Sequence, residues 1–419
     1  MLHICCVLIS EEFGLIEGTI GRIKVGDLQP VRVMAVINLS KESFYKGSVA
    51  TANQALTKAR SLAEEGADLI DLGAVSTAPG SPRIDESLER ERLLPELQQI
   101  LDQGLEVSVD TQRASIADKA LSMGAKCIND VSGLLDPSMS KTVSDYDASV
   151  IIMASRCVPG DLLTMEDILE VLAKRVGSAI EAGVDRDKIV VDPGIGKWIP
   201  EKNSEHDLAI LDGFRRLRAL GKPIMAALSR KSFIGARLDQ PDPSKRLCGS
   251  LAATAVAVYN GAHIVRTHDV SMSLDTIRMA EAIRGRLPRS EEGDLSVEVL
   301  GYLGHEIDLA DALRRAEVDP GGYRALCRKG SFRVLAIGGI SSMDAIIIKQ
   351  EMLARGGDAA IPKMALRCDP DPQHILVLGT LSQVSGLTRK LKDQPFRLPL
   401  VGKAIEAALK QIDDPERYR

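Results

Sequence analysis

The hexapeptide Val265–Val270 places a guanidinium and an imidazole together just after a short apolar stretch. The preceding residues, Gly261–Val265, are typical of a buried strand. Arg266 offers a rigid fork of hydrogen-bond donors, and His268 adds a second donor, positive or neutral, so the pair suits a phosphate ester. For these six residues alone, a surface loop with an ordinary ion pair to Asp269 is slightly the better explanation. Matching chemistry elsewhere in the chain decides between the two interpretations.

Polar residues of related chemistry end most of the other apolar stretches. They are Asn38, Thr77 (within the following loop), Asp110, Asn129, Asp192 and Lys231. Each has an ordinary explanation when taken alone. Asp110 or Asn129 can cap the next helix, and Asp192 can form the turn before a proline. Asn38 can satisfy its own loop backbone, and Lys231 can be a solvated loop cation. Their recurrence from strand to strand favours one shared site.

These residues fit a ligand with a flat ring at one end. A heterocycle with an amino-pyrimidinone edge presents adjacent N–H donors, which the carboxylate of Asp192 or Asp110 can accept together. Asn129 can both donate to and accept from a neighbouring ring nitrogen. Lys231 can donate to a ring oxygen or nitrogen. The sequence therefore predicts a carboxylate-lined ring pocket.

The remaining residues suit an anionic tail on the same ligand. Arg266, His268 and Asn38 form a candidate diphosphate site, and the amide oxygen of Asn38 suits Mg²⁺. A ring in one half of the site and a diphosphate leaving group in the other predict substitution at the carbon between them.

The elements that would position these residues repeat eight times between Val31 and Arg284. The strand-helix units begin at Arg32, Ala67, Leu105, Ala125, Ala148, Lys188, Pro223 and Ala262. Short, continuously apolar strands are typical of parallel strands buried on both faces. Eight units in roughly 250 residues predict an α/β fold of the (β/α)8 TIM barrel type, in which strand ends converge on one mouth. A doubly wound open sheet is the alternative.

Helices are predicted from the spacing of apolar residues and from the glycines that follow them. The longer ones are expected over residues 86–102, 164–182, 205–220 and 243–259. The alternation of Glu17–Gly26 predicts an N-terminal hairpin that covers one end of the sheet.

A second, smaller module is expected after the barrel. The charged stretch Arg286–Asp294 is interpreted as a linker. We expect residues 1–288 to form the barrel with its hairpin and residues 289–419 to form a small α+β module. Its predicted strands cover residues 334–337 and 374–378, and its predicted helices begin at Ser341 or Ser342 and at Leu400.

Composition limits the classes of function. The 419 residues carry a net charge of −5 with interspersed acids and bases, so nucleic acid is not an expected partner. No apolar run reaches membrane-spanning length, so no membrane partner is expected either. Seven scattered cysteines form no CxxC or zinc-like spacing. We expect a reduced, cytoplasmic enzyme.

Seven motifs in this order resemble dihydropteroate synthases. The motifs are Val36–Phe44, Ile70–Gly80, Val109–Thr111, Ile128–Gly133, Asp192–Gly196, Ser229–Gly235 and Arg266–Val270. The resemblance covers about Val31 to Arg284. It implies a pterin-binding barrel that joins an aryl amine to the methylene carbon of a dihydropterin diphosphate and releases pyrophosphate.

The resemblance also implies roles for individual residues. The residues implied to bind the pterin are Asp110, Asn129, Asp192, Lys231 and Arg266. The residues implied to be catalytic are Lys231, Arg266 and His268. Diphosphate binding falls to Asn38, Arg266 and His268, with Mg²⁺ as cofactor held by Asn38. Aryl amine binding falls to Phe44, Thr77, Pro79 and Ser232. We expect a homodimer whose partners are the two small-molecule substrates.

The second loop departs from the family pattern. The family usually has Glu-Ser-Thr-Arg-Pro-Gly, whereas this chain has Val75–Gly80 with Ala78 in place of the arginine. The candidate replacement cations are Lys41, Lys46 and Arg83. This pattern resembles the archaeal branch, which suggests a ribosyl-phosphate arylamine as acceptor instead of 4-aminobenzoate.

Two other functions remain compatible with a pterin barrel. One is a pterin-dependent corrinoid methyltransferase, and the other is a non-catalytic pterin-binding protein. Arg266 and His268 favour the synthase, because a methyl donor has no diphosphate to hold. In the second module, Ile346–Asp358 resembles extra domains fused to some synthases. Lys349 and Arg355 there could reach a phosphate or could be solvated helix charges.

Overall fold

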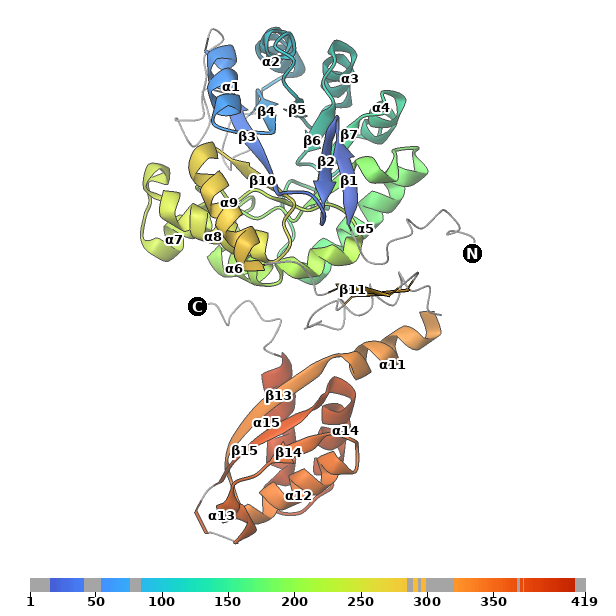
Figure 1. Ribbon diagram of the computed structural model, residues 1–419, viewed down its shortest axis with the longest axis vertical. Helices are drawn as coiled ribbons and strands as arrows, with labels where there is room; N and C mark the ends of the chain where they lie inside the picture. Colours follow the sequence, from blue (N-terminus) through green and yellow to red (C-terminus); the bar gives the residue numbers. More distant parts are fainter. Residues whose placement is uncertain are drawn as a thin grey trace. The chain divides into compact units, whose positions relative to one another are not determined.

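The computed structural model describes residues 16–40, 54–75, 84–284, 289–292, 295–298, 320–367, 370–371 and 373–410. Its contacts divide the chain into two compact units, one holding the described residues from 16 to 284 and the other those from 289 to 410. Figure 1 shows both units.

The first unit is a closed barrel of eight parallel strands. The strands are β3 (Arg32–Asn38), β4 (Leu69–Gly73), β5 (Val107–Asp110), β6 (Cys127–Asp130), β7 (Ser149–Met153), β8 (Ile189–Asp192), β9 (Met225–Ala226) and β10 (Ile264–Thr267). Neighbours in sequence pair from β3 to β8, and β10 pairs with both β9 and β3. A parallel bridge between Val191 and Ile224 joins the remaining two edges. The predicted TIM barrel is confirmed.

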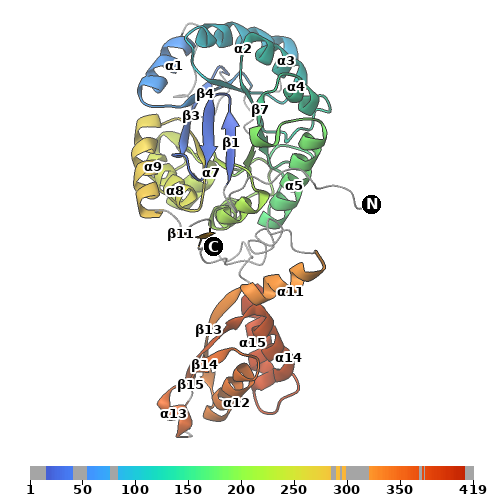
Figure 2. The same ribbon diagram turned by 45° about the vertical axis from the view of Figure 1, so that its right-hand side comes forward.

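Helices surround the strands, as Figures 1 and 2 show. They are α1 (Ala55–Glu64), α2 (Glu86–Leu101), α3 (Ala114–Met123), α4 (Met139–Asp145), α5 (Met165–Glu181), α6 (Ser204–Asp212), α7 (Ser232–Leu238), α8 (Leu247–Tyr259) and α9 (Val270–Arg284). The side chains of Asp85, Thr164 and Asn203 accept backbone N–H groups at the starts of α2, α5 and α6. Such capping satisfies N–H groups that a helix start leaves unpaired.

Two predicted helices are interrupted in the structure. The helix expected over 205–220 ends at Asp212, and a 3-10 helix over Phe214–Leu220 follows Gly213. The helix expected over 243–259 begins as a separate 3-10 turn, Pro243–Lys245, before α8. Glycine in a helix interior loses more conformational freedom than other residues, which favours the break at Gly213.

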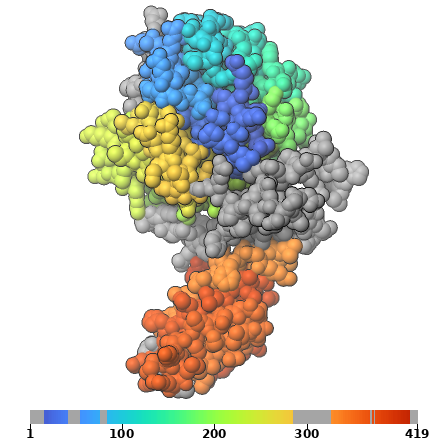
Figure 3. Space-filling view, viewed as in Figure 1, coloured from blue at the N-terminus to red at the C-terminus, as the bar shows by residue number. Residues whose placement is uncertain are grey.

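The N-terminal hairpin is confirmed and closes the amino-terminal end of the barrel. Its strands are β1 (Glu17–Ile20) and β2 (Ile23–Gly26). Ile20 and Val25 pack on one interior layer supplied by seven strands: Met34, Leu69, Cys127, Ile151, Val190, Met225 and Ile264. In Figure 3 the dark blue residues of the hairpin fill the middle of this face of the barrel. The barrel is therefore apolar and plugged at this end.

A partly buried ion pair holds the end of the hairpin in place. Asp27 accepts from both terminal nitrogens of Arg218 at 2.6 and 2.9 Å and lies 3.2 Å from Nε2 of His263. It also accepts the Ile16 N–H at 2.8 Å. Burial alone would raise the pKa of Asp27, but hydrogen bonds from His263 and Arg218 hold it well below its usual range.

The second unit has α+β architecture. An antiparallel sheet in the order β13 (Phe332–Ile340), β15 (Gln373–Thr380), β14 (Asp358–Ala360) is accompanied by α11 (Pro320–Gly330), α12 (Ser342–Leu353), α13 (Lys363–Leu366), α14 (Leu381–Leu391) and α15 (Leu398–Lys410). Ser341 caps α12 as predicted, through a reciprocal capping box with Asp344. The stretch predicted as a linker instead contributes to an antiparallel hairpin, β11 (Arg289–Glu292) and β12 (Leu295–Glu298).

No helix among the described residues has the length and apolar composition needed to cross a bilayer.

Candidate functional site

Strand alternation explains why polar side chains line the barrel above its apolar layer. Successive strand residues point to opposite faces, so a residue two positions after an interior one also points inward. Asp71, Asn129, Asp192 and Arg266 each lie two residues after a member of that apolar layer: Leu69, Cys127, Val190 and Ile264. The barrel interior therefore changes from apolar to charged over about one layer, toward the strands' carboxyl ends.

The register of four adjacent strands aligns three predicted site residues. Asn38 is paired with Gly73, Gly73 with Asp110, and Asp110 with Asn129. Gly73 is the small member of this row, and a side chain there would crowd Asp110, whose Cβ lies 3.3 Å from the position of an added Cβ. Asn38, Asp110 and Asn129 therefore share one rim, as the sequence predicted.

Asp71 is the central hydrogen-bond acceptor of the site. It is fully buried, and its Oδ2 accepts Nε of Arg266 at 2.7 Å and Nδ2 of Asn129 at 3.2 Å. Arg266 Nη2 lies 2.6 Å from the same oxygen and donates to Oδ2 of Asp110 at 3.0 Å. Residues on four different strands are thus joined through Asp71 and Arg266. The sequence predicted no role for Asp71, although a lone carboxylate within an otherwise apolar strand was the available signal.

This network shifts the pKa values of its members. Burial raises the pKa of Asp110 to about 7, with the Arg266 cation opposing the shift and Asp71 adding to it. Burial works against the charge on Arg266, but Asp71 and Asp110 outweigh it and raise its pKa further. Arg266 stays cationic at neutral pH, while Asp110 lies near the midpoint of its titration.

Two buried acceptor atoms in the network have no partner among the described residues. They are Oδ1 of Asn129 and Oδ1 of Asp71. Because Nδ2 of Asn129 faces the Asp71 carboxylate, the amide oxygen must face the other way. Leaving such groups unpaired costs about 1–3 kcal/mol each. Both oxygens can accept N–H donors from a ligand.

Asp192 is held in a turn built on a buried lysine. Its Oδ1 accepts the Gly194 N–H at 2.8 Å, and the Gly194 carbonyl accepts Nζ of Lys202 at the same distance. Lys202 is completely buried and lies 3.7 Å from Asp207, which accepts the Gly196 N–H at 2.8 Å. Neither Lys202 nor Asp207 was among the site residues predicted from the sequence. Burial raises the pKa of Asp192, opposed by the Gly194 hydrogen bond and by Lys231.

Lys231 lies beside this turn, with its ammonium available to a ligand. Its Nζ is 5.0 Å from the centroid of the Trp198 ring, a cation–π distance, and makes no hydrogen bond to a described residue. Gly196 has φ +130°, and an added Cβ would lie 3.3 Å from Nζ of Lys231. The glycine thus allows the lysine to pass close to the backbone. Burial lowers the pKa of Lys231 to about 8, partly offset by Asp192.

His268 is a neutral member of a cationic group. Its Nδ1 lies 2.9 Å from Oγ of Ser229, which also accepts the His268 N–H at 3.3 Å. Burial and the nearby cations Arg266 and Arg230 lower its pKa to about 3. Of the two states considered from the sequence, the imidazole therefore adopts the neutral one. Ser229 was not among the predicted site residues.

Asn38 satisfies its own loop in part. Its Oδ1 accepts the Ser40 N–H at 2.9 Å, which matches the ordinary alternative. An amide oxygen has two lone pairs, so one remains for a cation. Within the described ranges no group of three or more His, Cys, Asp or Glu side chains is arranged to hold a metal. Mg²⁺ is commonly bound by one or two protein oxygens plus phosphates, so the donor present here fits that ion.

The predicted aryl amine residues are described only in part. Phe44, Thr77 and Pro79 lie outside the described residues, as do Ala78 and its suggested replacements. Ser232 is the first residue of α7 and is exposed, directly after Lys231.

A family model described as "Pterin binding enzyme" matches residues 34–268. Among curated proteins, the dihydropteroate synthase of Bacillus subtilis is 35% identical over 254 residues, which cover 60% of this chain and 88% of that protein. A probable bifunctional folylpolyglutamate synthase/dihydropteroate synthase of Halobacterium salinarum is 38% identical over 260 residues. The match covers 60% of this chain but 31% of that longer protein.

Solved structures give the same result. The dihydropteroate synthase of Xanthomonas albilineans with 4-aminobenzoic acid has a TM-score of 0.56 and 33% identity, covering 62% of this chain and 95% of that one. The synthase of Thermus thermophilus in complex with 6HMPPP has a TM-score of 0.55 and 33% identity, covering 64% and 99%. The similarity accounts for the barrel and leaves the second unit outside it.

Proposed function

The chain belongs to the dihydropteroate synthase family of pterin binding enzymes, and we propose that its barrel joins an aryl amine to (7,8-dihydropterin-6-yl)methyl diphosphate. The family membership makes it a transferase of folate-type biosynthesis. The residue roles, the metal and the identity of the amine are part of the proposal.

The observation that carries the proposal is the pair of buried, unpartnered acceptors beside a cation. Oδ1 of Asn129 and Oδ1 of Asp71 face no donor among the described residues, and Nε of Arg266 donates to the other oxygen of the Asp71 carboxylate at 2.7 Å. A dihydropterin supplies ring N–H and amino donors in one plane, so it can satisfy such acceptors while its diphosphate contacts Arg266. Ligands lacking these donors would leave the oxygens unpaired.

In this proposal Asp192 and Lys231 join Asn129 and Asp71 in contacting the pterin ring, and these four residues form the pterin seat. Asp192 accepts from the amino-pyrimidinone edge, and its turn through Lys202 fixes the carboxylate in place. Lys231 donates to the ring oxygen or nitrogen, and its proximity to Trp198 places an aromatic face at the edge of the seat. Asp110 accepts from the ring and keeps Arg266 oriented.

Arg266, His268 and Asn38 hold the diphosphate. Arg266 contributes the permanent positive charge, whereas neutral His268 contributes one hydrogen-bond donor without charge. Mg²⁺, when bound at Asn38, would neutralise further negative charge on the departing group. Charge that develops on the diphosphate as it leaves is stabilised by these fixed groups, which need no rearrangement during reaction.

The reaction is then a substitution at the pterin methylene carbon. The carbon–oxygen bond breaks, and its electron pair leaves with pyrophosphate. The lone pair of the neutral aryl amine forms the new carbon–nitrogen bond, and the displaced amine proton passes to pyrophosphate or solvent. The chain's own residues bind, orient and stabilise charge, and no side chain is required as a general base.

The acceptor we propose is a ribosyl-phosphate arylamine, because Ala78 stands where the family has an arginine. The test uses the purified full chain with pterin diphosphate and either that amine or 4-aminobenzoate, measuring pyrophosphate release and the pteroate product. Faster turnover of plain 4-aminobenzoate would reject the acceptor but keep the synthase. Pterin binding without pyrophosphate release would reject the synthase in favour of a binding protein. Methyl transfer to a corrinoid would identify the methyltransferase.

The homodimer, the cytoplasmic location and the 288/289 boundary stay predictions.

A further inference from the structure

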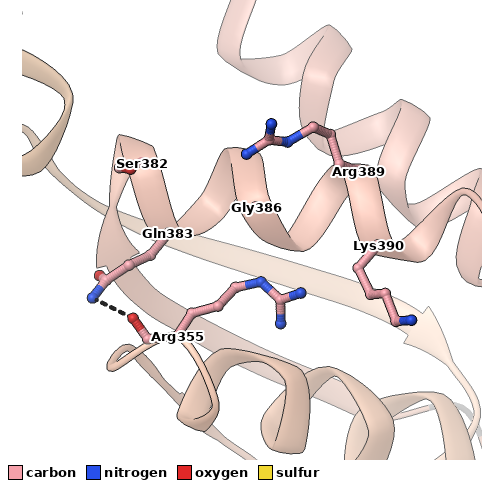
Figure 4. Close-up of a pocket in the computed structure, with 6 residues that line it drawn as sticks. All are labelled: Arg355, Ser382, Gln383, Gly386, Arg389 and Lys390. Carbon is pink, nitrogen blue, oxygen red and sulfur yellow. Dashed lines mark hydrogen bonds between the residues drawn. The ribbon is translucent and has the colours of Figure 1, made fainter. Parts of the chain in front are cut away.

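The second unit contains a cationic cavity that the family relationship does not assign. It has a volume of about 550 Å³ and is lined by Arg355, Ser382, Gln383, Gly386, Arg389 and Lys390. Figure 4 shows Arg355 reaching from the end of α12 toward α14, which carries the other five residues. Three of the six lining residues are cations and none is an acid. The cavity therefore has a strong excess of positive charge.

Arg355 is anchored so that one edge of its guanidinium stays available. Its Nη1 donates to the side chain of Glu351 at 2.6 Å and to the backbone carbonyl of the same residue. Nε and Nη2 have no partner among the described residues. These two nitrogens form one two-donor edge of the guanidinium, the geometry that binds a phosphate or carboxylate in bidentate fashion.

The glycine on α14 brings Arg355 against the helix. An added Cβ at Gly386 would lie 3.1 Å from Nε and 3.2 Å from Cδ of Arg355. The side chain of Arg355 thus packs where any larger residue would push it away. Its Nε faces the helix surface that carries the other cations.

Arg389 and Lys390 provide two further cations on the same helix. Arg389 uses Nε to donate to the Ser385 carbonyl at 3.3 Å, which leaves both terminal nitrogens without a described partner. The Lys390 side chain makes no hydrogen bond or ion pair with any described residue. By contrast, Lys349, the other cation considered from the sequence, is bonded to Asp358 at 3.0 Å and to the Ala359 carbonyl at 2.7 Å.

Gln383 fixes the shape of the cavity and is not itself available. Its Nε2 donates to the Arg355 carbonyl at 3.0 Å, the dashed contact in Figure 4, and its Oε1 accepts the Thr380 N–H at 2.8 Å. These bonds tie the end of α12 to the start of α14. The three cations therefore project from two elements whose spacing is set by hydrogen bonds.

We propose that this cavity binds the phosphate group of a small molecule, through the free edge of Arg355, the terminal nitrogens of Arg389 and the ammonium of Lys390. A dianionic phosphate matches a cavity with three cations and no lining acid better than a singly charged carboxylate does. The ligand is either pyrophosphate or a phosphate monoester, since both carry the same group. The site is separate from the barrel residues, so its failure would leave the proposed synthase reaction intact.

The experiment titrates the full chain with pyrophosphate, inorganic phosphate and ribose 5-phosphate by calorimetry at constant ionic strength. The test variant is Arg389→Gln/Lys390→Gln, in which both changed residues are exposed. The matched control is Lys403→Gln/Lys410→Gln, which removes the same charge from exposed positions of α15. The chain's single tryptophan, Trp198, lies in the barrel, so its fluorescence reports separately on anions bound there.

The expected result is binding that the test variant weakens by about tenfold or more, the loss expected from removing at least one charged hydrogen bond. The control should bind like the wild type, and the Trp198 response should not change in either variant. Tighter binding of pyrophosphate would identify the diphosphate as ligand, and tighter binding of ribose 5-phosphate would identify a monoester. Equal binding by wild type and test variant would overturn the proposal. So would equal weakening in the control, or equal competition by acetate, because general charge attraction would then suffice.

Discussion

Arg266 and Asp71 form an ion pair inside the barrel, with Nε and Nη2 of the guanidinium 2.7 and 2.6 Å from the same carboxylate oxygen. Asp71 is fully buried, and the Arg266 side chain keeps 20% of its exposure. The pair therefore connects the closed interior to the open mouth. Asp71 is a positioning residue, since it acts on a ligand's tail through Arg266.

Asp71→Asn should weaken catalysis without unfolding the barrel. The substitution keeps the side-chain volume but removes the charge that orients Arg266, a loss of about 1.5–3 kcal/mol for a charged hydrogen bond. We expect kcat/KM for pterin diphosphate to fall by about 10- to 150-fold. Steady-state kinetics measures the change, and a thermal melt checks folding. Unchanged kcat/KM in a folded variant would contradict the role given to Asp71.

Asp192→Ala should abolish detectable pterin binding, because it removes the acceptor held against the ring edge. Lys231→Ala should weaken binding by about 1.5–3 kcal/mol, the value of one charged hydrogen bond. Calorimetry with a pterin ligand measures both. The control is Lys222→Ala: Lys222 is also buried, but its Nζ donates to the Arg186 carbonyl, in the 3-10 turn that leads into the amino end of β8. Equal losses at Lys231 and Lys222 would show that the effect is not local to the pterin seat.

The pH dependence of kcat/KM should be a narrow bell. Asp110 has a raised pKa of about 7, so activity that needs its carboxylate is lost as pH falls through 7. Lys231 has a lowered pKa of about 8, so activity that needs its ammonium is lost as pH rises through 8. The profile of kcat/KM reports such groups in the free enzyme. A profile flat from about pH 5 to 9 would contradict both assignments.

Two variants identify which residue produces each limb of the pH profile of kcat/KM. Asp110→Asn should remove the acid limb, because an amide does not titrate. Lys231→Arg should move the alkaline limb upward, because a guanidinium stays protonated to about pH 12 or above. Either limb persisting unchanged in its own variant would mean that another group produces it.

Asp27→Ala should lower stability while leaving pterin affinity intact. It removes a carboxylate that Arg218 and His263 share at the plugged end, at a cost of about 2–4 kcal/mol. Denaturant unfolding measures the loss. The pKa of Asp27 is lower folded than unfolded, so its stabilisation is present above the unfolded value, near 4, and is lost as pH falls below it. The wild type should therefore lose more stability than the variant on acidification, and parallel losses would contradict this.

The sequence predicted the barrel because its strands are apolar and short and most of them end in a glycine or polar residue. It also predicted Asn38, Asp110 and Asn129 on one rim, because parallel register carries equivalent strand ends to the same level. Asp71 was missed since its role depends on which partner crosses the barrel interior from β10. Sequence spacing cannot show that contact between residues 195 positions apart.

Some helices and turns were not predicted from the sequence, because tertiary contacts or a capping pattern that was overlooked determine where they form. The short helix α7, after Lys231, was not predicted, because seven residues carry little periodic signal. Helix α14 was missed although Thr380 and Gln383 form a capping box that can be recognised from their spacing. The break at Gly213 and the hairpin that starts at Arg289 were likewise unforeseen.

Ile20 and Val25 of the hairpin cover the apolar layer beneath Asp71. The interior of the barrel is therefore closed at that end. A ligand bound next to the closed end of the barrel must enter before a ligand bound nearer the mouth, and must leave after it. A pterin seated against Asn129 would therefore precede the amine, and the joined product would be retained until pyrophosphate has cleared the entrance. We therefore expect the two substrates to bind in a fixed order because the floor of the barrel is closed.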